Sequence, residues 1–331
     1  MTSNWDFLGN AWAVDMLKKH VTHQAVRHAY LLTGPSGLGR RTLALRFAQA
    51  LDCPKPAAPG EPCRTCKTCR QIEAMQYPDL AVVQAEREGG VLKVEKIREV
   101  QHSLALKPYQ GRYRVALFLR FDEANPSAAN ALLKTLEEAP AYVVLLLTAE
   151  TPEQLLPTIV SRCEILRLRP LPIADVEAFL TEKGADGSRA ALLAHLSGGR
   201  PGYALHLMEN PGALDFRRQR LDDLEHLLGA GRGERFAYAE SLARDKEAFR
   251  SVLLLWLAYW RDVLLCASGA AAPLTNVDRA APIEALAARL SLAEARQRVT
   301  DMEGAVARLE KNVNPRLLAE VLLLDWPHGG A

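Results

Sequence analysis

A glycine-rich loop directly after a short apolar run is the feature that most restricts how this 331-residue chain can fold. The run covers residues 29–33, Ala-Tyr-Leu-Leu-Thr, and residues 34–39 of the loop read Gly-Pro-Ser-Gly-Leu-Gly. Residues 41–51 then have the apolar spacing of a helix. A buried strand, a glycine loop and a helix in this order predict a loop of the phosphate-binding type, in which backbone N–H groups surround the phosphate.

The loop lacks the two side chains that a phosphate-binding loop uses for catalysis. Its pattern ends in Lys and a hydroxyl residue, but those positions are Arg40 and Arg41, whereas Gly34, Gly37 and Gly39 keep the backbone framework. The Lys reaches the β- and γ-phosphates, and the hydroxyl binds Mg²⁺. A planar guanidinium does not replace a compact ammonium group. We therefore expect a nucleotide-binding type of domain that does not hydrolyse ATP and acts through a partner.

Strand and helix patterns alternate through the first half of the chain. Apolar residues recur at helical spacing over residues 94–104 and 129–136. Short apolar runs predict further strands over residues 80–83, 115–121, 142–148 and 164–168. This alternation predicts a mostly parallel sheet that is covered by helices on both faces.

The pattern changes after this region, because strand-like runs stop and Ala and Leu at helical spacing dominate. We therefore predict three parts. Residues 1–168 form an α/β domain of the phosphate-loop type, residues 169–210 form a small helical lid, and residues 211–331 form an all-α domain.

Charge and hydropathy restrict the classes of function. The 41 basic and 39 acidic residues nearly balance, which argues against electrostatic DNA binding by the whole chain. No basic stretch followed by an apolar run opens the chain, so we expect no signal peptide. The most apolar stretch, residues 252–266, contains Arg261 and Asp262 and is too short to cross a bilayer. We expect a cytoplasmic protein that does not contact membranes.

Four cysteines lie close together after the first predicted helix. Cys53, Cys63, Cys66 and Cys69 have the spacing C-x₉-C-x₂-C-x₂-C, and the linker between the first two is rich in proline. The x₂ gaps let a tight turn direct its thiolates to one centre, and Cys53 can complete a tetrahedral site. In a reducing compartment such a cluster favours a metal over disulfides. No His or water-activating acid lies within the cluster, so we predict a structural Zn²⁺ site.

Two acidic residues and one arginine are the other candidate functional side chains. Asp122 and Glu123 follow an apolar run, as in enzymes where the first acid helps to hold Mg²⁺ and the second orients water. Solvated acids at a strand end are the alternative. Arg162, in Ser161-Arg162-Cys163, lies at a turn after the fourth predicted core strand and a short helix, which makes it a candidate arginine finger. Capping of that turn is its alternative role.

With these motifs together, the chain resembles the AAA+ clamp-loader family over nearly its whole length. The four-cysteine insert and residues 130–140, Asn-Ala-Leu-Leu-Lys-Thr-Leu-Glu-Glu-Ala-Pro, are the specific part of the resemblance. Residues 28–34, 161–163 and 198–202 add to it. The last of these runs contains Arg200, a lid arginine whose role the sequence leaves open.

The resemblance implies a nucleotide-binding domain, a helical lid and a helical collar that joins subunits into a hetero-pentamer. The replacements at Arg40 and Arg41 favour a non-hydrolysing member of that assembly. Its partners would be ATPase subunits and a clamp-opening subunit, and the complex would place a sliding clamp on primer–template DNA. Arg162 would contact ATP bound to a neighbouring subunit, and the pair of acids, Asp122 and Glu123, would be vestigial.

Two other functions remain open from the sequence. An active ATPase of the same family would use Arg40 in place of the Lys, and it would hydrolyse ATP when isolated. A zinc-dependent nucleic-acid-binding protein would bind DNA alone, in a salt-sensitive manner.

Overall fold

The computed structural model describes residues 5–311 and 313–326. Residues 1–4 of the first predicted domain, and residues 312 and 327–331 of the last one, lie outside the described residues. The chain forms two compact units. The first comprises Met1–Pro172 together with Arg200–Tyr203, and the second comprises Ile173–Gly199 and Ala204–Ala331. The division into three domains stays a prediction.

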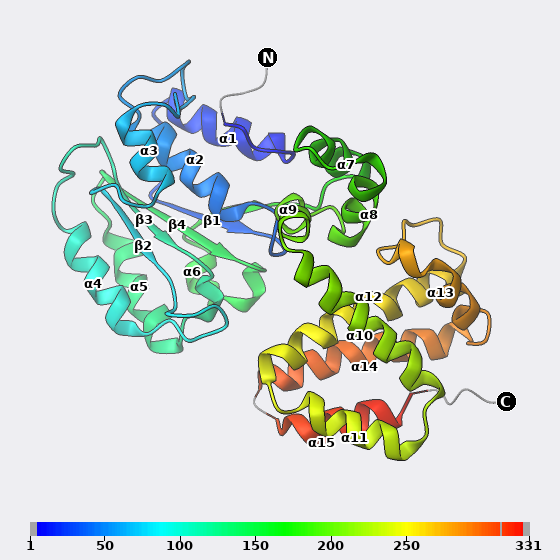
Figure 1. Cartoon of the computed structure of the whole chain (residues 1–331). Coiled ribbons are helices and arrows are strands. Elements are labelled where there is room, and N and C mark those ends of the chain that lie inside the picture. Colours follow the sequence, from blue (N-terminus) through cyan, green and yellow to red (C-terminus); the bar gives the residue numbers. More distant parts are fainter. Residues whose placement is uncertain (1–4, 312, 327–331) are drawn as a thin grey trace. The chain divides into compact units, whose positions relative to one another are not determined.

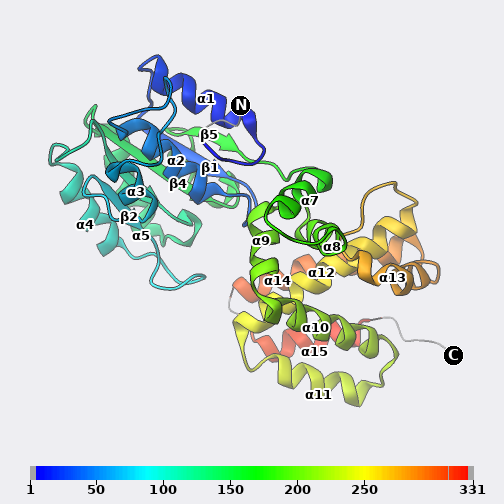
Figure 2. The ribbon, with the colours of Figure 1, turned by 45° about the horizontal axis from the view of Figure 1, so that its top comes forward.

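The first unit contains a five-stranded parallel sheet of order β2-β3-β4-β1-β5 (Figure 1). The strands are β1 (Ala29–Thr33), β2 (Leu80–Val83), β3 (Arg114–Phe118), β4 (Val143–Ala149) and β5 (Glu164–Arg167). Figure 2 shows β5 beside β1 at one edge of the sheet. The predicted parallel α/β sheet is therefore confirmed. The third strand is shorter than the sequence predicted, because it ends at Phe118 and not at residue 121.

Helices cover both faces of this sheet because its strands are apolar on both sides. Tyr30 and Leu32 of β1 pack with α1, α2 and α3 on one face, whereas Leu31 packs with α4, α5 and α6 on the other. The helices are α1 (Ala11–Thr22), α2 (Arg40–Asp52), α3 (Lys67–Glu73), α4 (Val94–Leu104), α5 (Pro126–Glu138) and α6 (Pro157–Val160). The short 3₁₀ helices are η1 (Phe121–Glu123) and η2 (Pro152–Gln154).

The second unit is helical in its described part. Its first helices are α7 (Ile173–Glu182) and α8 (Gly187–Ser197), and α9 (Pro201–Glu209) begins within the four-residue segment that belongs to the first unit. The remaining elements are α10 (Pro211–Gly229), α11 (Arg232–Leu242), α12 (Lys246–Ser268), η3 (Val277–Arg279), α13 (Ala280–Ala287), α14 (Leu292–Glu310) and α15 (Pro315–Leu324).

Helix α12 forms the centre of the C-terminal core. It packs against α10, α13 and α14, and Trp256 and Trp260, one helical turn apart, are fully buried. By length and composition α12 as a whole is long and apolar enough to cross a membrane, so the prediction from residues 252–266 that this segment is too short to do so is wrong. The apolar side chains that it buries against the neighbouring helices are those expected of a core helix in a folded helical domain.

Candidate functional site

The glycine loop lies at the carboxyl end of β1, between the ends of β4 and β5. The Gly34 N–H donates to the Glu150 carbonyl at 2.9 Å, and the Leu168 N–H donates to the Thr33 carbonyl at 2.8 Å. Ligands of open parallel sheets bind at this edge, where the strand connections diverge. Gly39 has φ 86° and precedes α2, so the loop leads directly into a helix N-terminus, as the sequence predicted.

A short segment of the first unit, Arg200–Tyr203, packs directly on this loop. The Gly202 N–H donates to the Gly37 carbonyl at 2.8 Å. The approach is so close that a Cβ at Gly37 would lie 2.8 Å from the Tyr203 Cβ and 2.9 Å from its backbone N. Gly37 is therefore held from one side by contacts with the backbone of this segment.

Arg200 lies in this segment and stacks on the aromatic ring of Tyr203. Its guanidinium carbon is 4.5 Å from the ring centroid. Burial lowers the pKa of Arg200, and Tyr203 and Glu150 oppose that effect. The arginine that the sequence singled out as a lid arginine thus lies in the segment that packs on the glycine loop.

Arg40 replaces the catalytic Lys and is buried, with 8% of its surface exposed. Burial lowers its pKa, whereas the nearby Asp122 and Glu150 carboxylates raise it. Asp122 is affected in the opposite sense: burial raises its pKa, and the guanidinium of Arg40 partly offsets that effect. Neither Arg40 Nη1 nor Asp122 Oδ1 has a hydrogen-bond partner among the described residues. The structure therefore brings Arg40 and Asp122 together, but Arg41 is exposed.

The second acid of the pair is occupied by local contacts. Glu123 Oε1 accepts hydrogen bonds from the Gly89 N–H at 2.9 Å and from Arg120 Nε at 2.8 Å. Arg120 lies beyond β3, in a left-handed turn with φ 49°, and its N–H donates to Thr148 Oγ1. Arg120 therefore lies outside the strand, although the sequence predicted that the strand would extend over residues 115–121. In this conformation the carboxylate that would orient water is paired with an arginine.

Arg162 lies at the surface, in the turn after α6. Its Nη1 donates to the Thr158 carbonyl at 2.9 Å, and its Nη2 donates to Glu137 Oε1 at 2.6 Å. The arginine side chain is 36% exposed and that of Glu137 is 50% exposed. Arg162 is therefore a partly exposed arginine on a hydrogen-bonded turn, and Glu137 is a partner to which the sequence assigned no role.

The four cysteines form one cluster. Their sulfur atoms all lie within 4.8 Å of one another, and the Cys53 and Cys63 sulfurs are 3.5 Å apart. A tetrahedral metal with bonds of about 2.3 Å to sulfur requires sulfur atoms about 3.8 Å apart. The backbone N–H groups of Cys63, Cys66 and Cys69 each donate to the sulfur of the preceding cysteine at 3.4 Å. The cluster could hold a metal ion.

The sulfur atoms differ in their pKa values. Burial raises the pKa of Cys53 and of Cys69. Burial acts in the same direction on Cys63, but N–H groups of Cys66 and Thr65 and neighbouring thiols outweigh it, and its pKa falls to about 6. At least one thiolate is therefore accessible near neutral pH, as a metal site requires.

The cysteine insert is attached to the rest of the first unit by side chains of α1, of α2 and of the segment before α1. Lys18 Nζ donates to Glu61 Oε1 at 2.6 Å, and Gln49 Nε2 donates to the Cys69 carbonyl at 2.8 Å. Trp5 Nε1 donates to the Gly60 carbonyl at 3.1 Å. These contacts hold the insert at neighbouring residues Gly60 and Glu61 and at the backbone of Cys69.

Family models match both halves of the chain. A model described as DNA polymerase III, delta subunit, matches residues 9–172, and one described as the C terminal of that subunit matches residues 211–328. The delta′ subunit of DNA polymerase III from Pseudomonas aeruginosa is 33% identical over 315 residues, which cover 90% of this chain and 91% of that protein. This chain belongs to the DNA polymerase III delta′ family. The resemblance inferred from the sequence motifs is confirmed.

Other relatives include a second delta′ subunit and a tau subunit of DNA polymerase III. The delta′ subunit from Bacillus subtilis is 28% identical to this delta′-family chain over 318 residues, which cover 95% of each protein. The tau subunit from Salmonella typhimurium is 33% identical over 171 residues, but these cover only 52% of this chain and 26% of tau. The similarity to tau is therefore partial, whereas the similarity to delta′ subunits extends over nearly the whole chain.

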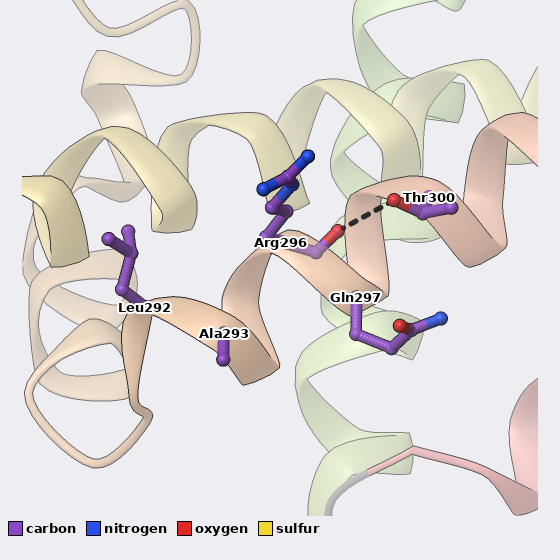
Figure 3. Close-up of a pocket in the computed structure, with 5 residues that line it drawn as sticks. All are labelled: Leu292, Ala293, Arg296, Gln297 and Thr300. Atoms are coloured by element: carbon purple, nitrogen blue, oxygen red, sulfur yellow. Dashed lines mark hydrogen bonds between the residues drawn. The ribbon is translucent and has the colours of Figure 1, made fainter.

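The delta′-family chain also has a surface hollow of about 670 Å³ along α14 (Figure 3). Five residues of this one helix line it: Leu292, Ala293, Arg296, Gln297 and Thr300. The Thr300 hydroxyl donates to the Arg296 carbonyl one turn earlier, so this hydrogen bond is made within the helix itself. A single charged side chain does not make a catalytic set, and none of the predicted site residues of this delta′ chain line the hollow.

We expect Gly37→Ala to destabilise the first unit of this delta′-family chain. Gly37 has φ 89°, a conformation that costs a residue with a Cβ about 1–3 kcal/mol, and the new methyl group would also collide with Tyr203. Thermal unfolding and limited proteolysis would detect the loss. Gly212→Ala is the matched control, because a Cβ at that glycine would have nothing within 4 Å and the methyl group should be tolerated. Equal stability of the two variants would contradict the prediction.

Proposed function

We propose that this chain is a non-hydrolysing subunit of a DNA polymerase III clamp-loader complex. It acts beside ATPase subunits and a clamp-opening subunit in a hetero-pentamer that loads a sliding clamp onto primer–template DNA. Residues 211–331 form the collar that joins it to its neighbours. The whole-length similarity to delta′ subunits and the partial similarity to a tau subunit support these partners. The complex works in the cytoplasm, and this subunit does not contact a membrane.

The observation that carries the proposal is the pair of arginines that replaces the catalytic residues of the loop. Phosphoryl transfer depends on a Lys at the β- and γ-phosphates and on a hydroxyl ligand for Mg²⁺. Arg41 has no hydroxyl, and Arg40 is buried close to Asp122, the acid that would help to hold the metal. The positive charge of the Arg40 guanidinium close to the Asp122 carboxylate disfavours binding of a divalent cation to that carboxylate.

Arg162 is the contribution of this subunit to ATP hydrolysis by a neighbour. The guanidinium is always charged, and its fork matches the oxygens of a phosphate. The surface position of Arg162 and its ordered turn support a role across a subunit interface. In this proposal Arg162 stabilises the charge that develops on the γ-phosphate of ATP bound to the next subunit.

The metal of the cysteine cluster is a structural Zn²⁺. Four sulfur ligands close together, with no side chain in the cluster to activate water, are typical of closed zinc sites. Cys53, Cys63, Cys66 and Cys69 would hold the ion, and it would stabilise an insert that has little apolar core of its own. The contacts from Lys18 and Gln49 would then fix the insert to α1 and α2.

We expect the isolated chain to show no steady ATP turnover. Two contacts that stabilise charge in the transition state are missing from its loop, and each such contact is worth about 10²–10³ in rate. A phosphate-release assay of the purified chain, with and without DNA, would measure the activity. Asp122→Ala distinguishes its own activity from a contaminating ATPase, because only activity that arises at this loop would depend on that acid. Turnover that is abolished by Asp122→Ala would favour an active ATPase with Arg40 in the role of the Lys.

A further inference from the structure

Two anchors hold the guanidinium of Arg162, and they come from different helices. Nη2 donates to the Glu137 carboxylate, near the end of α5, and Nη1 donates to the Thr158 carbonyl, in α6. A planar guanidinium that is bonded at both terminal nitrogens has its orientation defined as well as its position.

Both anchors are supported by the core of the first unit. Leu136, next to Glu137, is 2% exposed, and Ile159, next to Thr158, is fully buried in the same apolar cluster. The Arg162 N–H donates to the Ile159 carbonyl at 3.1 Å, so the backbone of the turn is fixed as well. The two acceptors therefore lie on rigid elements and not on loops.

The anchored arginine keeps hydrogen-bonding capacity for a second partner. A guanidinium has five N–H donors, and the two bonds described here use one on each terminal nitrogen. A free arginine side chain has about 2 kcal/mol of rotamer entropy to lose on binding. An arginine that is already oriented loses less of it when it meets a phosphate.

We propose that Glu137 is a positioning residue for Arg162. Its carboxylate holds the guanidinium in the orientation in which the remaining N–H groups reach a phosphate of ATP on a neighbouring subunit. This inference rests on the proposed function of Arg162. Ion pairs as exposed as this one contribute at most about 1 kcal/mol to folding, so removal of Glu137 leaves the fold intact and changes the rate.

The test uses complexes assembled from the full chain, the ATPase subunits, the clamp-opening subunit and the clamp. Single-turnover hydrolysis is measured at saturating ATP with primer–template DNA, and the KM for ATP is measured separately. We expect Glu137→Ala to slow hydrolysis at the site beside this subunit about two- to fivefold, the equivalent of a surface ion pair. The KM for ATP and the amount of assembled complex should not change, because Glu137 does not bind the nucleotide.

Two further variants, at the neighbouring residue and at Glu137 itself, distinguish a positioning role of Glu137 from a general effect of negative charge on hydrolysis. Glu138→Ala is the matched control: this exposed residue is next on α5, and no described contact joins it to Arg162. It should hydrolyse ATP at the wild-type rate. Glu137→Gln keeps an acceptor and should lie between Glu137→Ala and wild type. The double variant Glu137→Ala with Arg162→Ala should be no slower than Arg162→Ala alone, because Glu137 acts through that arginine.

Each other outcome overturns a specific statement. If Arg162→Ala hydrolyses ATP at the wild-type rate, the proposed role of Arg162 fails, and the role of Glu137 fails with it. If Arg162→Ala is slow but Glu137→Ala is not, only the positioning role is wrong. A faster Glu137→Ala complex would mean that Glu137 restrains the arginine, and equal losses in Glu137→Ala and Glu138→Ala would mean a non-specific charge effect. Both results would overturn the proposal.

Discussion

A clamp-loader complex that carries Arg162→Ala should assemble normally but load clamps slowly. Arginine fingers in GTPases are worth about 10³–10⁵ in rate, because the guanidinium stabilises charge on the transferred phosphate. The proposed complex would hold several ATP sites, so the loss should be confined to the site beside this subunit and the overall decrease should be smaller. DNA-stimulated ATP hydrolysis and the rate of clamp loading are the measurements.

Because of its position, Arg162 can be replaced without a large expected effect on folding. The side chain is 36% exposed and its ion pair with Glu137 lies at the surface, so the variant should keep its fold and its metal. Arg167→Ala is the matched control, because this exposed arginine of β5 also pairs with an acid, Glu153, at 3.5 Å. An assembled Arg162→Ala complex that loads clamps at the wild-type rate would assign the arginine to capping of its turn.

The sequence predicted those parts of the fold that depend on local pattern. The alternation of apolar runs and helical spacing located every strand of the sheet, because strands buried on both faces read as continuous apolar runs. The exception is the end of β3. An apolar pattern continues to Phe121, but Arg120 adopts a left-handed conformation that ends the strand, and hydropathy does not report backbone dihedral angles.

The contacts of the candidate site were harder to predict because they join distant parts of the chain. The hydrogen bond from Gly202 to Gly37 uses only backbone atoms, so no side-chain pattern marks it. Glu137 and Glu138 are neighbours within residues 130–140, the run that carries much of the resemblance. The sequence does not show which of the two bonds to Arg162, because that depends on how α5 packs in the fold.

Burial of charged residues was the other feature that hydropathy could not predict. Arg235 has the composition of a surface residue, yet it is fully buried in the C-terminal unit. Its guanidinium donates to the carbonyls of Leu227 and Leu228 in α10, of Leu323 in α15 and of Trp326 after it. The five N–H donors of one guanidinium can thus bond to carbonyl groups at the C-terminal ends of both α10 and α15, and a sequence pattern does not reveal such contacts.

We expect one tightly bound Zn²⁺ per chain, and loss of order in the cysteine insert when the metal is removed. A structural Cys₄ site contributes about 10–16 kcal/mol of apparent binding energy at neutral pH, and folding of its loop depends on that energy. Elemental analysis of protein purified without chelator would give the stoichiometry. Hydrogen exchange over residues 53–69 before and after chelation would report the loss of order.

Substitution of one ligand should have the same local effect as chelation. Cys63→Ser removes one of the four sulfur ligands, the one whose pKa is lowered, so affinity for the metal should fall steeply. The C-terminal helices should stay folded, because these contacts of the insert are with other residues of the first unit, in the N-terminal segment, α1 and α2. Cys266→Ser, outside the cluster, should retain its zinc. Wild-type protein without zinc, or Cys63→Ser protein with a full equivalent of it, would show that the cluster is not the metal site.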